Sequence, residues 1–163
     1  MRNKTQKKGG MGMKAQASLE LLITLSFGIA ILLPLVIIAF VQLANSNAAL
    51  SSIEAQEAAS KLSSVATLVG SEGSPAKQLV QIEMPPGVDY LYVGSVNNSV
   101  GHEIIFVIRS SNGPSYITSY TPVNVSGNLG GIVNPGTYLV NISAQQSCPT
   151  NQNAACVYMA PTG

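Results

Sequence analysis

The chain has 163 residues, enough for one modest domain plus a membrane segment but too few for two full globular domains. Only 9% of the residues are charged and 46% are apolar, whereas an ordinary soluble domain is roughly 25% charged. No acid precedes Glu20, and residues from Gln16 onward carry three cations against seven acids, a net charge of −4. A basic head on a faintly acidic body argues against nucleic-acid binding and is typical of a membrane topology signal.

Residues 21–41 form an uninterrupted apolar block without a single charge, in which only Thr24 and Ser26 have polar side chains. As a helix these 21 residues rise about 30 Å, enough to cross a hydrocarbon core. The alternative is a buried core helix, but such a helix rarely stays apolar on every face over this length. We therefore predict a transmembrane helix, with residues 21–44 as its membrane or filament-core part.

Five of the eight cations lie before this block and set its direction. Under the positive-inside rule the N-terminus stays in the cytoplasm, and residues after about 45 are exported. The apolar run is longer than that of a secretory signal peptide, and a helical pattern follows it, so we expect the segment to be retained after processing. The five cations are Arg2, Lys4, Lys7, Lys8 and Lys14.

The residues that lead into the apolar block are Lys14, Ala15, Gln16, Ser18 and Glu20. This stretch resembles the class III signal peptide of archaeal type IV pilin-like proteins, whose pattern is a basic residue, a small residue, Gln, any residue, Ser, any residue and Glu. Gly is frequent at the small position, so Ala15 is a mild departure. The motif spans about seven residues and, with the apolar helix, the resemblance covers about 55 of the 163 residues.

The resemblance implies that a prepilin peptidase cuts between Ala15 and Gln16, which makes Gln16 the mature N-terminus and Glu20 the fifth mature residue. It also implies that Glu20 pairs with the freed amine of a neighbouring subunit, and that a pilus assembly platform builds the subunits into a filament. The alternative for Glu20 is a simple position at a helix N-terminus, favoured by the helix dipole.

Pro34 interrupts the hydrogen-bonding pattern of the apolar helix and is expected to kink or locally loosen it. Pilin-like helices often carry a proline in this region, which points to a role in filament packing. The alternative is a harmless proline, which is common in membrane helices.

Apolar residues continue beyond the block at roughly helical spacing, and Gly70, Ser71, Gly73 and Pro75 then indicate the end of the helix. We predict one helix over residues 16–69, whose second half is amphipathic and supports a C-terminal domain. The predicted stripe consists of Leu43, Leu50 and Ile53, followed after a one-residue slip by Ala58, Leu62, Val65 and Val69.

From residue 70 to 163 the composition is typical of β-structure, with turn signals between short runs rich in β-branched residues and tyrosine. We predict an α+β fold in which this part forms a small antiparallel sheet or sandwich, after a cleaved leader of residues 1–15 and the helix of residues 16–69. Pro122 marks the fourth strand as an edge strand, and the continuously apolar run of residues 104–108 predicts a central strand covered on both faces. The strands are expected at residues 78–84, 90–96, 103–110, 116–124 and 136–144, with a weaker one at 155–159.

Cys148 and Cys156 are the two cysteines of the chain, and a region predicted to lie outside the cell favours a disulfide between them. Two free thiols are the alternative, and a zinc site lacks ligands because His102 is the single histidine. Asn97, Asn124 and Asn141 each begin an Asn-x-Ser sequon and are candidate glycosylation sites, although chance sequons are expected in a chain rich in Asn and Ser.

No nucleophile–base pattern, phosphate-binding loop or metal-ligand spacing occurs in the sequence, so we expect neither an enzyme nor a cofactor. The first hypothesis is a structural subunit of an archaeal type IV pilus-like filament that serves adhesion or surface attachment. The second is a single-pass membrane protein whose exported β-rich domain binds a ligand or partner as a monomer. The third is a minor or pseudopilin-like component of a related machine.

Overall fold

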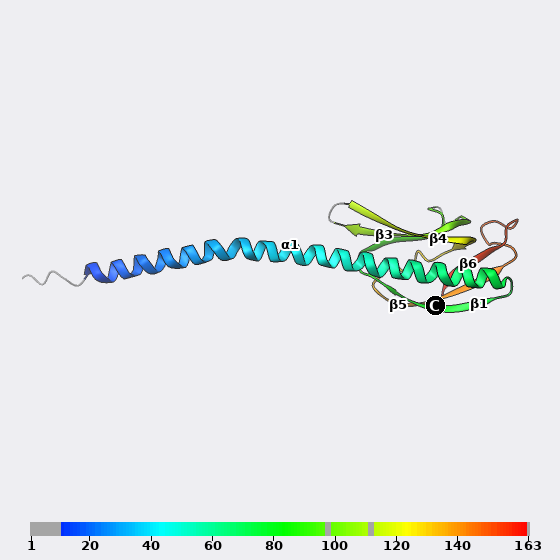
Figure 1. Ribbon diagram of the computed structural model, residues 1–163, viewed down its shortest axis with the longest axis horizontal. Helices are drawn as coiled ribbons and strands as arrows, with labels where there is room; N and C mark the ends of the chain where they lie inside the picture. The colour runs from blue at the N-terminus through cyan, green and yellow to red at the C-terminus, as the bar shows by residue number, and fades with distance from the viewer. Residues whose placement is uncertain (1–10, 97–98, 111–112, 163) are drawn as a thin grey trace, which may run out of the picture. The chain divides into compact units, whose positions relative to one another are not determined.

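The computed structural model describes residues 11–96, 99–110 and 113–162, with side chains from Leu19 onward. One long helix precedes a β-sheet (Figure 1), which is the predicted α+β arrangement. The chain divides into two compact units, Met1–Asn45 and Ser46–Gly163, and the helix contributes to both. The elements are α1 (Met11–Glu72), β1 (Lys77–Met84), β2 (Val88–Gly94), β3 (Gly101–Ser110), β4 (Gly113–Gly127), β5 (Gly136–Gln145) and β6 (Cys156–Pro161).

The six strands form one sheet in the order β1-β5-β6-β4-β3-β2, and neighbouring strands are antiparallel except at one place. The exception is the short parallel pairing of β4 with β6, over Val125–Gly127 and Val157–Met159. The predicted strands are confirmed, including the weaker sixth one, and they form a single mixed sheet where a sandwich was the alternative.

The second half of α1 packs on one face of this sheet through small side chains. Ala55, Ala59 and Ala66 are completely buried, as is Leu62, and Val69 is buried near the end of the helix. The sheet contributes alternate residues to this core, and the loop after β4 adds Leu129 and Ile132. The main strand residues of the core are Val80, Ile82, Met84, Leu91, Val93, Ile104, Phe106, Ile108, Val140, Ile142, Val157 and Met159.

The amphipathic stripe was predicted correctly in its second part and wrongly in its first. Leu62 and Val69 are buried, but Leu50 and Ile53 are 56% and 65% exposed. The buried side of this half begins at Ser51, where a small polar residue takes the place that the pattern assigned to large apolar ones. The hydrophobicity of Leu50 and Ile53 therefore serves something other than the core of their own domain.

The helix ends three residues later than predicted, at Glu72. Gly73 follows with a φ of +75°, and its amide donates to the carbonyl of Val69 at 3.2 Å, a glycine C-terminal cap. Gly70 lies inside the helix, where a Cβ atom would approach Val123 Cγ1 to 2.8 Å. Gly70 is thus explained by close packing of the helix against β4.

The prediction that Pro122 marks an edge strand is wrong, because β4 lies between β6 and β3. Pairing of β4 with β3 runs to Tyr120 opposite Glu103 and resumes only at Val125 opposite Gly101. Pro122 lies in the irregular stretch between these two pairs. The regular pairing is interrupted there, so the N–H group that proline lacks is not needed for a hydrogen bond between strands.

The continuously apolar run in β3 is covered on both faces, as predicted. Ile104, Phe106 and Ile108 belong to the core beneath α1. Ile105 and Val107 point to the opposite face and are only 7% and 6% exposed, so side chains of that face must cover them.

Candidate membrane and assembly segment

The first half of α1 exposes nearly every large apolar side chain that it carries. From Leu19 to Leu43 these side chains are 48–69% exposed, on all sides of the helix. This half, residues 19–43, is called the apolar half below. α1 is the one helix of the described residues that is long and apolar enough to cross a membrane, and it lies near the N-terminus. The chain is therefore compatible with a single-pass membrane protein.

The two polar side chains of the apolar half satisfy their hydrogen bonds within the helix. The hydroxyl of Thr24 donates to the carbonyl of Glu20 at 2.6 Å, with a second contact to that of Leu21 at 3.1 Å. The hydroxyl of Ser26 donates to the carbonyl of Leu22 at 2.7 Å. Such back-bonding removes the cost of a free hydroxyl in an apolar environment.

The residues of the predicted cleavage motif lie in the first turns of α1. Lys14, Ala15, Gln16 and Ser18 have helical backbone, and their side chains lie outside the described part. The side chain of Glu20 is exposed, and among the described residues it has no ion pair or side-chain hydrogen bond. Its carboxylate is therefore available to a partner outside this chain.

α1 continues through Pro34 without a break in its assignment. The proline nitrogen carries no hydrogen, so the carbonyl one turn earlier, at Ala30, lacks its usual helical donor. Local loosening at this point remains a prediction.

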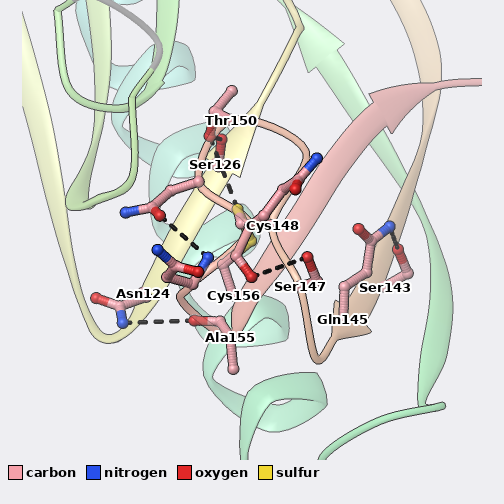
Figure 2. Close-up of a disulfide and its surroundings, with 12 residues drawn as sticks. Asn124, Ser126, Ser143, Gln145, Ser147, Cys148, Thr150, Ala155 and Cys156 are labelled. Carbon is pink, nitrogen blue, oxygen red and sulfur yellow. Dashed lines mark hydrogen bonds between the residues drawn. A yellow bond between two sulfur atoms is a disulfide. The ribbon is translucent and has the colours of Figure 1, made fainter.

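The predicted disulfide between Cys148 and Cys156 is present (Figure 2), with 5.5 Å between the two Cα atoms. Both cysteines are buried, and they close a small loop between β5 and β6. The hydroxyls of Ser126 on β4 and Thr150 in the loop share a hydrogen bond of 2.9 Å, which links the loop to β4. Within the loop, the amide of Cys148 donates to the carbonyl of Ala154 at 3.0 Å.

The structure places the three sequons in different environments. Asn97 lies outside the described residues. Asn124 is exposed and donates to the carbonyl of Ala155 at 3.4 Å, but the serine of its sequon, Ser126, is completely buried. Asn141 is half-buried within β5, and the serine two residues later is buried as well. An enzyme that must reach both Asn and Ser would have to modify these two sites before folding.

Sequence reasoning did not identify a cluster of tyrosines on the face of the sheet opposite α1. Tyr90 and Tyr92 of β2 and Tyr116 and Tyr120 of β4 flank β3 on this side, and they are called the tyrosine face below. Alternation within each strand was visible in the sequence, but the pairing that brings β2 and β4 to either side of β3 was not.

No three of the metal-binding residue types His, Cys, Asp and Glu gather anywhere in the described residues. His102 is exposed, stacks on Tyr120 with 5.8 Å between ring centres, and its Nδ1 lies 3.1 Å from the carbonyl of Thr121. Comparisons with family models, curated proteins and solved structures returned no match to this chain.

Proposed function

We propose that this chain is a structural subunit of an archaeal type IV pilus-like surface filament that serves adhesion or surface attachment. A prepilin peptidase removes residues 1–15 on the cytoplasmic side of the membrane. The apolar half of α1 holds the precursor in the membrane and then packs against the same segment of neighbouring subunits.

The observation that carries the proposal is the exposure of the apolar half on every side, next to a domain that is already complete. The sheet obtains its core from the second half of α1, so residues 19–43 contribute nothing that the domain needs. Surface this apolar must be covered by lipid or by protein. A filament supplies both in succession, first the bilayer and then sister helices.

Glu20 adds a second argument, because a carboxylate at the start of a membrane helix costs free energy unless it is paired. The exposed side chain of Glu20 has no such partner within the described residues. Cleavage before Gln16 would create a positively charged amine four residues away in sequence, and the amine of a neighbouring subunit is a partner of the right charge.

The decisive experiment is N-terminal sequencing of the surface-associated protein from peptidase-competent and peptidase-deficient cells. We expect Gln16 as the first residue in the former and an intact leader in the latter. Ala15→Leu should block the cut, because the position requires a small residue. Ala15→Gly is the matched control and should be cut normally. A chain that keeps its leader in both kinds of cell would remove the filament proposal and leave the membrane-anchored monomer.

The role of Glu20 is separated from helix-dipole stabilisation by Glu20→Gln. If Glu20 pairs with a neighbouring amine, this variant should be cut normally but give far fewer sheared filaments than the wild type. A dipole effect of about 0.3–1 kcal/mol would leave the filament yield nearly unchanged. Normal filament yield from Glu20→Gln would therefore assign the residue to the helix N-terminus alone.

A further inference from the structure

The tyrosine face is built by strand register. Tyr90 of β2 lies opposite Val107 of β3, and Val107 lies opposite Tyr116 of β4. In the next row Tyr92 flanks Ile105, with an exposed Thr118 on the other side. Strands β2 and β4 thus place tyrosine rings beside β3, and these rings cover the side chains of Ile105 and Val107.

The accessible surface of this face is mainly aromatic carbon and hydroxyl oxygen, with the exposed side chains of His102, Glu103 and Arg109 beside the rings. Tyr90, Tyr116 and Tyr120 are 58%, 66% and 67% exposed. Tyr90 also stacks on Tyr92, with ring centres 5.8 Å apart. At ordinary strand spacings the exposed rings span about 10 Å across the strands and about 13 Å along β4. Tyrosine in a core would bury its ring, so an exposed group of this kind marks a contact surface.

Charge on this face is low and largely cancelled. Arg109 is the only lysine or arginine of β2, β3 and β4, and it forms an ion pair with Asp89 at 2.7 Å. Glu103, opposite Tyr120, is the remaining acid of these strands. An anionic polymer would need a cluster of basic side chains that the described strands do not offer.

The low net charge of this face and its ring faces with hydroxyl groups favour a neutral sugar as the partner. Neutral sugars combine apolar C–H faces with hydroxyls, which complement the apolar body and polar tip of tyrosine. A small ligand would need a concave site, whereas an open sheet face with several rings suits an extended chain. Ile105 and Val107 are buried on this face, so the face offers tyrosine rings and hydroxyl groups rather than exposed aliphatic side chains.

We propose that the tyrosine face binds a neutral polysaccharide, with Tyr116 and Tyr120 as its principal contacts. The inference rests on the proposed role in surface attachment, for which it names the class of partner. The helix residues of the core, Ala55 to Val69, pack on the opposite face of the sheet, so they do not cover the tyrosines.

The test uses the full chain in mild detergent, titrated with soluble dextran, mannan and β-1,3-glucan, with alginate as the anionic comparison. The chain contains no tryptophan, and four of its six tyrosines lie on this face, so tyrosine fluorescence reports binding directly. We expect at least one neutral polymer to bind and alginate not to bind. Tyr116→Ser with Tyr120→Ser should weaken binding about tenfold or more, and the corresponding double Phe variant should retain most of it.

Leu79→Ser is the matched control, since Leu79 is 60% exposed on β1 of the same sheet, and it should bind like the wild type. Binding that survives the double Ser variant, equal binding of alginate, or no binding of any neutral polymer would overturn the inference. Self-association or capture of a protein that depends on the tyrosines, without sugar binding, would assign the face to a protein partner instead. Normal cleavage and filaments without sugar binding would reject this inference and leave the filament proposal intact.

Discussion

The first half of α1 is apolar on all sides and the second half is amphipathic, and the two differ in how their apolar side chains are buried. The apolar half presents leucine, isoleucine and phenylalanine on every side, all of them exposed. The packed half, residues 46–72, buries mainly alanine along one side and leaves Leu50, Ile53 and Leu68 exposed on others. Hydrophobicity alone does not say where a helix is buried; the size and angular distribution of its apolar side chains do.

The comparison distinguishes side chains that are buried by their own domain from side chains that the rest of the chain leaves exposed. The packed half buries mostly short side chains along the one side that the sheet covers. In the proposed filament the apolar half is surrounded first by fluid lipid and then by other helices, which accounts for large side chains on all its sides. Substitutions in the two halves should therefore affect different measurements.

The largest expected difference is in the stability of the β-containing unit. Leu62→Ala should lower its free energy of unfolding by about 2–5 kcal/mol, because the substitution leaves a cavity beneath the sheet. Leu33→Ala removes the same atoms from an exposed position of the apolar half and should leave this free energy unchanged. Denaturant unfolding of the detergent-solubilised chain, followed by tyrosine fluorescence, measures both. Equal effects would refute the division between the halves.

The opposite result is expected for membrane insertion. Leu33→Arg should disfavour insertion by about 2.5–3.5 kcal/mol, roughly a 100-fold shift of the partition between membrane and soluble fractions. Ile53→Arg introduces the same charge at an exposed position of the packed half. We expect it to insert normally, and to change the free energy of unfolding by less than about 0.5 kcal/mol. A membrane fraction that Leu33→Arg leaves unchanged would mean that position 33 does not lie in the hydrocarbon core of a bilayer.

The disulfide should contribute to the β-containing unit and nothing to the apolar half. Replacing Cys148 and Cys156 by Ser should lower the free energy of unfolding by about 2–3 kcal/mol, the loop-closure entropy of a small ring. A reducing agent should reproduce the loss in the wild type and have no further effect on the variant. The fraction of protein in the membrane should not change. A reductant-sensitive double variant would show that some other property of the protein responds to the reagent.

The smallest effect tests a polar contact between the packed half and the sheet. The hydroxyl of Ser119 on β4 donates to that of Ser63 on α1 at 2.8 Å. Ser119→Ala should cost about 1 kcal/mol, and Thr118→Ala, an exposed neighbour, should be neutral within about 0.5 kcal/mol. The double variant with Ser63→Ala should lose less than the sum of the single losses, as measured by a double-mutant cycle. Strict additivity would mean that this hydrogen bond contributes nothing.

Much of the fold followed from patterns within short segments. The turn residues and the dense β-branched runs identified all six strands, and Cys148 and Cys156 were correctly predicted to pair. The errors arose where the role of a residue depends on a contact with a residue that is distant in the sequence. Gly70 is needed by Val123 rather than by a helix end, Pro122 is accommodated by an irregular stretch in the middle of the sheet, and Leu50 is exposed because smaller residues face the strands.

Close approach of two strands gives another example. At Gly127 an added Cβ atom would lie 2.5 Å from the carbonyl oxygen of Met159. The glycine is therefore required by the parallel contact of β4 with β6, which joins strands more than 25 residues apart in the chain. Nothing in the sequence around Gly127 indicated this contact.

The sequence by itself determined the apolar half, the motif around Ala15 and Gln16, the order of the strands along the chain and the closeness of the two cysteines, because each is a local property of composition and spacing. Only the tertiary structure decided which side of the packed half is buried, which strands are neighbours, and that Tyr90, Tyr92, Tyr116 and Tyr120 share one surface. These depend on pairing between segments far apart in the chain, where the free energy of packing selects one register from many that the local patterns allow.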